Sequence, residues 1–388
     1  MNSSKNTGTK PIVVWHEFDG KGDTSIEVLE SICRDYSAER GLSVVPEVMN
    51  ITELGIRLRA ISDGGPSPMA ALVPADLAGY GGRAQYSQVP DSFWERAGIT
   101  DDEVIASMRP HGCQYGVPIL RGNHLVLYFN REIYPEAPGS WEELTAAAEG
   151  LRSRGVVPLG ADLKDPYCFI PFLTACGGWP LKNGEPDLAS PEMAKALELV
   201  RSGLEQGVVE SLHGPTALLD RFIAGEVGAI ICGEWIFNYL HQHMENRLDV
   251  ASLPSIGGNR ALSMTSSIGL VFPGEALASE QGEELLELAA YMLREEKQRE
   301  WATRVQRIPV HPGVRAAMEA EAPPVRARLI RQMANTRSMP VEPVMEAVWE
   351  AMREGLLGIE EQEGGVTARF MQEQAEGRRI LAAGNKTR

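Results

Sequence analysis

Long apolar runs and positive charge are both scarce in this chain of 388 residues. No stretch approaches the roughly 18 consecutive apolar residues that a membrane-spanning helix needs, so we expect a soluble chain. There are 37 Lys and Arg against 53 Asp and Glu, which gives a formal net charge of -16. A surface of that sign repels polyphosphates, and a nucleic-acid partner is therefore not expected.

Cysteines are few and scattered, and they form no Cys-x-x-Cys pair. Their odd number and irregular spacing favour neither a disulfide framework nor a zinc site. We therefore predict that the thiols are small, buried hydrophobic groups. The five are Cys33, Cys113, Cys168, Cys176 and Cys232.

The common signatures of catalysis are also absent. The chain has no Gly-x-Ser-x-Gly elbow, no Gly-x-x-x-x-Gly-Lys-Ser/Thr loop, no dinucleotide fingerprint after a strand and no His-Glu-x-x-His helix. His241 and His243 are two apart, which on a helix points them to different faces. We expect no enzyme, no metal and no cofactor, although Glu17 and Asp19 leave a glycosidase-like pair of carboxylates open.

The chain does contain enough apolar side chain for a sizeable core, since 43% of its residues are hydrophobic and 23% are charged. At roughly 100 to 200 residues per domain, its length predicts two domains. Residues 1–10 are expected to be a flexible, polar lead-in, because they lack the apolar core of a secretory signal. From this segment we expect either a protein that stays inside the cell or one whose signal has been removed.

The opening segment has the pattern of a strand, a turn, a helix and a second strand. Residues 11–15 are apolar and rich in β-branched side chains, and Thr24 with Glu27 predicts a capping box for a helix that ends at Gly41. Residues 42–48 then predict the next strand. This order is typical of an α/β protein whose mostly parallel sheet is flanked by helices.

The same pattern recurs further along the chain. Ser140 and Ser190 each mark the start of a helix. Residues 227–232 predict an apolar strand that breaks at Gly233, and a further helix opens at Trp235. Turns of this kind, between a strand and the following helix, are where α/β proteins place their ligands. After about residue 275 the pattern is mainly helical.

Five short segments, in this order and spacing, carry a resemblance to a known family. They are residues 13–17 (VVWHE), 115–118 (YGVP) leading to 127–131 (LYFNR), 140–144 (SWEEL), 222–235 (FIAGEVGAIICGEW) and 308–310 (IPV). Together they resemble the extracellular solute-binding proteins of ABC transporters, in the carbohydrate or maltose-binding-like family. The resemblance covers residues 11–381. It departs from the family pattern in the turn at 64–68 and in Arg121 beside the hinge, and both departures argue against a typical maltodextrin as the ligand.

The resemblance implies a two-lobed periplasmic-binding-protein-like fold, each lobe a mostly parallel sheet flanked by helices, with the ligand in the cleft between the lobes. The first lobe would hold residues 11–119 and 272–322. The second would hold residues 120–271 and 323–388. The hinge would cross near 119–121, 267–270 and 322–324, and its closure on the ligand would be the mechanism of binding.

Ligand contacts are also implied, because a sugar needs flat aromatic rings for its C–H faces and charged or amide groups for its hydroxyls. Trp235 is expected to stack on a sugar, with core packing as its alternative, and Tyr167 is expected to be a second aromatic contact. Trp349 is expected to lie in the core of its helix. The further candidates are Glu17, Asp19, His16 and Trp179, with Arg121 and Arg307 for a ligand that carries a carboxylate or a phosphate.

The function implied is a monomeric receptor that delivers a carbohydrate or related polyhydroxylated solute to the permease of an ABC importer. Its expected location is the periplasm or the cell surface, with a signal or lipid anchor removed, or the cytoplasm if the chain is native in full length. A glycoside-acting α/β enzyme and a sensory or adhesive two-lobed module stay open as alternatives. The aromatic content of 6% argues mildly against a long oligosaccharide as ligand.

Overall fold

The computed structural model describes residues 10–18, 20–82 and 86–384, and the chain divides into two units. The first unit is made of two segments, the one that ends at Arg121 and Ser267–Met318. The second unit comprises Gly122–Ser266 and the segment from Glu319 onward. The chain therefore crosses from one unit to the other after Arg121, after Ser266 and after Met318.

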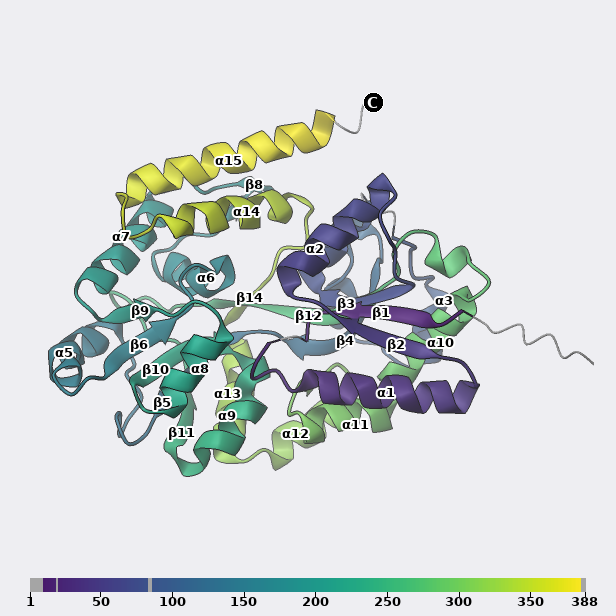
Figure 1. Ribbon diagram of the computed structural model, residues 1–388, viewed down its shortest axis with the longest axis horizontal. Helices are drawn as coiled ribbons and strands as arrows, with labels where there is room; N and C mark the ends of the chain where they lie inside the picture. The colour runs from purple at the N-terminus through teal and green to yellow at the C-terminus, as the bar shows by residue number, and fades with distance from the viewer. Residues whose placement is uncertain (1–9, 19, 83–85, 385–388) are drawn as a thin grey trace, which may run out of the picture. The chain divides into compact units, whose positions relative to one another are not determined.

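The sheet of the first unit contains the parallel pairing that the opening segment predicts (Figure 1). β1 pairs in parallel with β2 on one side and with β3 on the other. Antiparallel ladders join β12 to β3 and β13 to β4. The strands are β1 (Ile12–His16), β2 (Val44–Val48), β3 (Ala70–Pro74), β4 (Gly116–Gly122), β12 (Ser263–Val271) and β13 (Ile308–Pro309).

The helices of the first unit supply its apolar core. On α1, the buried residues Val28, Leu29, Ile32 and Tyr36 recur at the helical period and join a cluster that includes the sheet residues. The predicted capping box at the start of α1 is wrong in detail, because Asp23 rather than Thr24 accepts the first free amide. The helices are α1 (Ser25–Arg40), α2 (Ile51–Ala60), α3 (Ser92–Ala97), α4 (Asp102–Ala106), α10 (Gly282–Leu293), α11 (Glu295–Arg304) and α12 (Pro312–Glu321).

The sheet of the second unit places three parallel strands side by side, with β6 between β9 and β10. β5 and β11 continue the sheet with antiparallel ladders beyond β10. Elsewhere in this unit, β14 pairs in parallel with the first residues of β12, and β7 forms a short hairpin with β8. The strands are β5 (Leu125–Asn130), β6 (Val157–Ala161), β7 (Leu181–Lys182), β8 (Glu185–Pro186), β9 (Val209–Ser211), β10 (Val227–Gly233), β11 (Leu248–Ala251) and β14 (Thr336–Ser338).

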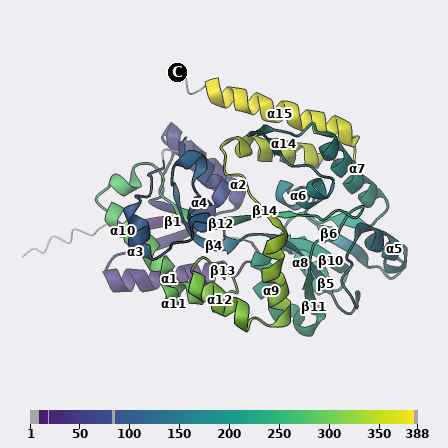
Figure 2. The ribbon, with the colours of Figure 1, turned by 180° about the vertical axis from the view of Figure 1, so that it is seen from behind.

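The C-terminal helices complete the second unit. α15 lies along both α14 and α7, as Figures 1 and 2 show from opposite sides. Ser140 and Ser190 cap α5 and α7 as predicted, and each hydroxyl accepts the amide three residues on. The helices are α5 (Trp141–Arg152), α6 (Pro166–Ala175), α7 (Pro191–Glu205), α8 (Pro215–Ile223), α9 (Phe237–Met244), α13 (Pro324–Arg331), α14 (Val344–Leu357) and α15 (Gly364–Gly384).

All five thiols are free, but they are less uniformly buried than the sequence suggested. Cys33 and Cys168 are buried, and burial raises the pKa of the Cys33 thiol to about 12, so that it stays neutral. Cys113, Cys176 and Cys232 are half-buried, which contradicts the prediction for these three. Each of the three lies at or beside the end of an element or in a turn, where packing is incomplete.

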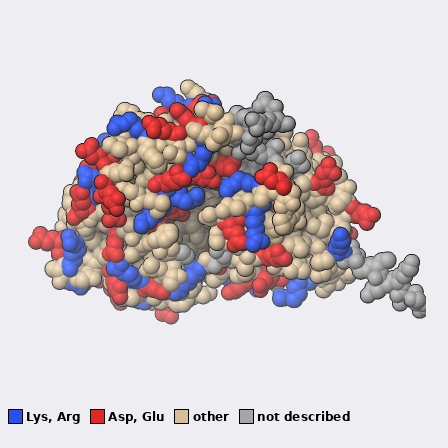
Figure 3. Space-filling view, turned by 45° about the horizontal axis from the view of Figure 1, so that its top comes forward, with Lys and Arg blue, Asp and Glu red and all other residues tan. Residues whose placement is uncertain are grey.

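Charged groups of both signs are intermixed on the face shown in Figure 3. Within the described ranges, no helix is long and apolar enough to cross a membrane. In the same residues, no group of three or more His, Cys, Asp or Glu side chains is placed to hold a metal ion.

Candidate functional site

One edge of the second unit's sheet gathers three turns that follow parallel strands. β6, β9 and β10 run in the same direction, so their carboxyl ends lie along one edge. Asp162, just after β6, accepts a hydrogen bond from the amide of Gly214 at 2.9 Å. Its carboxylate also lies 3.2 Å from Nδ1 of His213, in the turn after β9. These contacts tie two neighbouring turns into one polar rim.

Trp235 lies in the turn after β10, at the same edge. It belongs to a 3-10 turn, Glu234–Ile236, which leads into α9, and its side chain is half-buried. The indole folds back over Gly233, where an added Cβ would come within 2.0 Å of the ring. The Gly233 carbonyl is fixed in turn by the hydroxyl of Tyr128, which donates to it at 2.9 Å. Because Gly233 has no side chain, the ring of Trp235 can pack against the end of the strand. Part of the ring stays exposed to solvent.

Tyr167 is the second residue of α6, the helix that follows β6. Asp165 caps this helix by accepting the amide of Tyr167 at 3.0 Å. The phenol hydroxyl lies within hydrogen-bonding distance of two main-chain carbonyls, those of Asn123 and Met264. Because these contacts hold the oxygen, the half-buried ring is the part of Tyr167 that is available to a ligand.

Trp349, on α14, lies beside Tyr167. The two ring centres are 6.4 Å apart and the ring planes meet at 60°. Trp349 is half-buried, so the prediction that it belongs to the core of its helix is wrong. Its apolar neighbours in sequence suggested a buried position, whereas Val348 points inward and Trp349 lies beside the inward-facing stripe. No local signal in the sequence pairs Trp349 with Tyr167, because the contact joins distant segments.

Trp179 follows the glycine turn at the end of α6 and is also half-buried. The guanidinium carbon of Arg337 lies 3.9 Å from the centre of its ring. Trp179, Tyr167 and Trp235 thus all belong to the second unit, and each leaves part of its ring exposed.

The remaining predicted residues belong to the first unit. Glu17 follows β1 directly and is half-buried, whereas Asp19 lies outside the described residues. His16 ends β1 and is 1% exposed. Its Nδ1 accepts the amide of Phe18 at 3.3 Å, and burial lowers the pKa of the imidazole to about 4. This environment holds His16 neutral and favours a structural role for it.

The two predicted arginines are both engaged inside the first unit. Arg121 pairs with Glu103 at 3.0 Å and lies 3.9 Å from Asp101. Arg307 is 1% exposed and donates to the hydroxyl of Ser25 at 2.9 Å. Arg307 also lies 3.5 Å from the Asp23 carboxylate, so it stabilises the start of α1. Neither guanidinium is placed as an open site for an anionic ligand.

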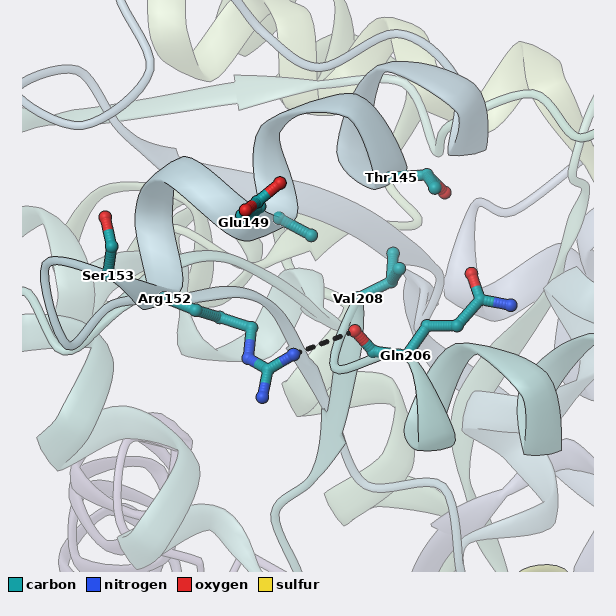
Figure 4. A pocket seen from close by; sticks show the side chains of 7 residues that line it. Thr145, Glu149, Arg152, Ser153, Gln206 and Val208 are labelled. Carbon is teal, nitrogen blue, oxygen red and sulfur yellow. Dashed lines mark hydrogen bonds between the residues drawn. The ribbon is translucent and has the colours of Figure 1, made fainter.

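A separate recess of about 480 Å³ lies beside α5 in the second unit (Figure 4). Arg152 crosses it and donates to the main-chain carbonyl of Gln206 at 3.1 Å. The lining has no aromatic side chain and none of the sequence-predicted residues; it consists of Thr145, Ala148, Glu149, Arg152, Ser153, Gln206 and Val208. It lacks the flat apolar surface that a sugar ring needs. The better candidate site is the set of half-buried rings of Trp235, Tyr167, Trp349 and Trp179, which we call the aromatic rim.

Comparison with known proteins identifies the family. The model of a family described as bacterial extracellular solute-binding protein matches residues 31–327. The chain belongs to this family. A similar curated protein is the maltooligosaccharide ABC transporter solute-binding lipoprotein of Streptococcus pneumoniae R6, which is 21% identical over 338 residues. That alignment covers 83% of this chain and 78% of the relative, and the protein of the same name from the serotype 4 strain TIGR4 matches equally.

A solved structure confirms the predicted fold class of this extracellular solute-binding protein. The maltose/maltodextrin-binding domain MalE from Bdellovibrio bacteriovorus, bound to maltotriose, superposes with a TM-score of 0.84. The alignment covers 95% of this chain and 99% of that domain, at 20% identity. The predicted resemblance to maltose-binding-like proteins is therefore confirmed by sequence and by structure.

Proposed function

We propose that this chain is the receptor of an ABC importer and that its solute is a carbohydrate. The observation that carries the proposal is the set of half-buried aromatic rings in the second unit: Trp235 at the edge of the sheet, and Tyr167 with Trp349. Rings of this kind offer flat apolar surface to the C–H faces of a sugar, while the polar rim at Asp162 offers acceptors to its hydroxyls. The names of the similar proteins, which include maltooligosaccharide and maltotriose, support the same class of ligand.

The proposed mechanism is reversible binding without chemical change. Binding shifts the protein toward a closed form because the ligand binds that form more tightly than the open form. Three chain crossings, after Arg121, Ser266 and Met318, supply the hinge. The partner is the permease of the importer, and the receptor works outside the cytoplasmic membrane, in the periplasm or at the cell surface.

Calorimetric titration with maltotriose and with other mono-, di- and oligosaccharides tests the proposal. We expect saturable binding of at least one sugar, and we expect Trp235→Ala to weaken it by about tenfold or more through the loss of the stacking surface. Phe370→Ala is the matched control, because Phe370 is an exposed aromatic residue on α15. Circular dichroism of both variants checks that the fold is unchanged.

Two outcomes count against the proposal. Equal affinity of Trp235→Ala and the wild-type protein removes Trp235 from the site. Release of the aglycone from chromogenic glycosides, at a rate that scales with protein concentration, makes the chain an enzyme instead of a receptor.

A further inference from the structure

Arg337 and Trp179 form a stacked cation–aromatic pair on the surface of the second unit. The guanidinium carbon is 3.9 Å from the ring centre, which is the closest of the cation–aromatic contacts found among the described residues. Arg337 is exposed and Trp179 is half-buried. Among the residues that the structure describes, no carboxylate forms an ion pair with Arg337 within 4.0 Å, in contrast to Arg121 and Arg328. One guanidinium edge is therefore available to an anion from solution.

The backbone that leads into Trp179 is closely packed. Gly178, just before Trp179, donates its amide to Leu173 at 2.9 Å and has no space for a Cβ, which would come within 2.4 Å of the Leu173 side chain. One turn earlier, Thr174 both donates to and accepts from the main chain of Leu262, at 2.8 and 2.9 Å. Leu262 immediately precedes β12, so the end of α6, which Trp179 follows, is anchored to the start of that strand.

The guanidinium half is anchored to the same strand. Arg337 lies on β14 and is the register partner of Met264 on β12. The Met264 carbonyl is also 3.2 Å from the Tyr167 hydroxyl. In this ladder the Thr265 carbonyl accepts the amide of Met339, so the Met264 carbonyl points away from β14. Arg337 and the Tyr167 hydroxyl therefore lie at opposite edges of β12, and Met264 is the residue that links them.

This combination suits a sugar that carries a carboxylate. A guanidinium binds a planar carboxylate through two parallel N–H donors, and stacking on an indole restrains its orientation in advance. A chain of net charge -16 otherwise repels anions, so a local cation beside an aromatic ring is what an acidic ligand requires. We propose that Arg337, held against Trp179, binds the carboxylate of an acidic sugar and makes the receptor selective for anionic over neutral carbohydrates. This inference rests on the proposed function and specifies its ligand class.

Titration with matched neutral and acidic trisaccharides tests the inference. The probes are maltotriose with maltotrionate, its oxidised form, and galactotriose with trigalacturonate. We expect at least one acid to bind about tenfold more tightly than its neutral partner at low salt, and less so at high salt. Arg337→Gln should bring the acid down to the affinity of the neutral sugar and leave the neutral sugar unchanged. Arg154→Gln, an exposed arginine of the same unit, should preserve the preference.

The outcomes separate this inference from the proposed function. Equal binding of acidic and neutral sugars by the wild-type protein overturns the selectivity and leaves a sugar receptor standing. An equal loss of both ligands in Arg337→Gln also overturns it, because it shows a structural role for Arg337. Failure of all four sugars to bind overturns the inference and counts against the proposed function. The proposed function can still be tested separately, by measuring the affinity of Trp235→Ala for any other sugar that binds.

Discussion

His16 is a residue whose protonation should link the stability of the first unit to pH. Burial lowers its pKa to about 4, whereas an unfolded histidine titrates near its ordinary value of about 6.5. Between these two values the unfolded chain binds the proton and the folded chain does not. The contribution of His16 is therefore fully present above about pH 6.5 and is lost as the pH falls toward 4, by up to about 3 kcal/mol.

Urea denaturation at a series of pH values measures this effect. His16→Asn keeps an acceptor for the amide of Phe18 but cannot take up a proton, so its free energy of unfolding should fall less steeply than that of the wild-type protein over this pH window. His243→Asn removes an exposed histidine and is the matched control for the substitution itself. Parallel curves for His16→Asn and the wild-type protein would show that His16 titrates alike in both states.

The aromatic residues of the rim show what can be predicted at the scale of single residues. Trp235 was identifiable because it follows an apolar strand and a glycine, a local pattern that places it at a strand end. Trp349 and Arg337 could not be identified in this way. The position of Trp349 depends on its contact with Tyr167, and that of Arg337 on its pairing with Met264, and both partners are far away in the sequence. Residue type alone could not separate Arg337 from Arg307, which is buried.

Helix α5 provides a prediction at the scale of the element. Ser140 accepts the amide of Glu143 at 3.2 Å, and the Glu143 carboxylate accepts the amide of Gly139 at 2.7 Å. Ser140→Ala removes the first of these contacts and should lower the free energy of unfolding by about 1 kcal/mol. Ser153→Ala, at the other end of the helix, is the matched control and should cost less, because its exposed hydroxyl only donates to Gly150. Equal losses in thermal denaturation would argue against the cap.

The starts of α1 and α5 look alike in sequence but fold differently. Each has a hydroxyl residue followed three positions later by a glutamate, yet only Ser140 accepts the amide three residues on. At α1, Asp23 precedes Thr24 and its carboxylate takes the amide of Ser25 at 2.9 Å. A charged acceptor competes better than a hydroxyl for a free amide, so one preceding residue changes which side chain caps the helix.

At the scale of the whole molecule, the α/β class was predictable and much of the pairing was not. Strand, glycine turn and helix signals predicted β1, α7 and β10 because each depends on neighbours in sequence. β12 shows the limit of this approach. It pairs with β3 in the first unit and with β14 in the second, and no local pattern specifies either partner. Long-range pairing of this kind is decided by packing and not by propensity.

The second unit is completed only by the C-terminal segment, which leads to a prediction about α15. Met371 on this helix is fully buried. It packs closely against Gly355 of α14, where an added Cβ would come within 2.4 Å of the Met371 side chain. Met371→Ala leaves a cavity at this contact and should lower the free energy of unfolding by about 2 to 5 kcal/mol. Phe370→Ala, one residue away, should cost far less because its ring is 39% exposed. Chemical denaturation followed by circular dichroism measures both variants, and similar costs for the two would mean that α15 does not dock through the face that carries Met371.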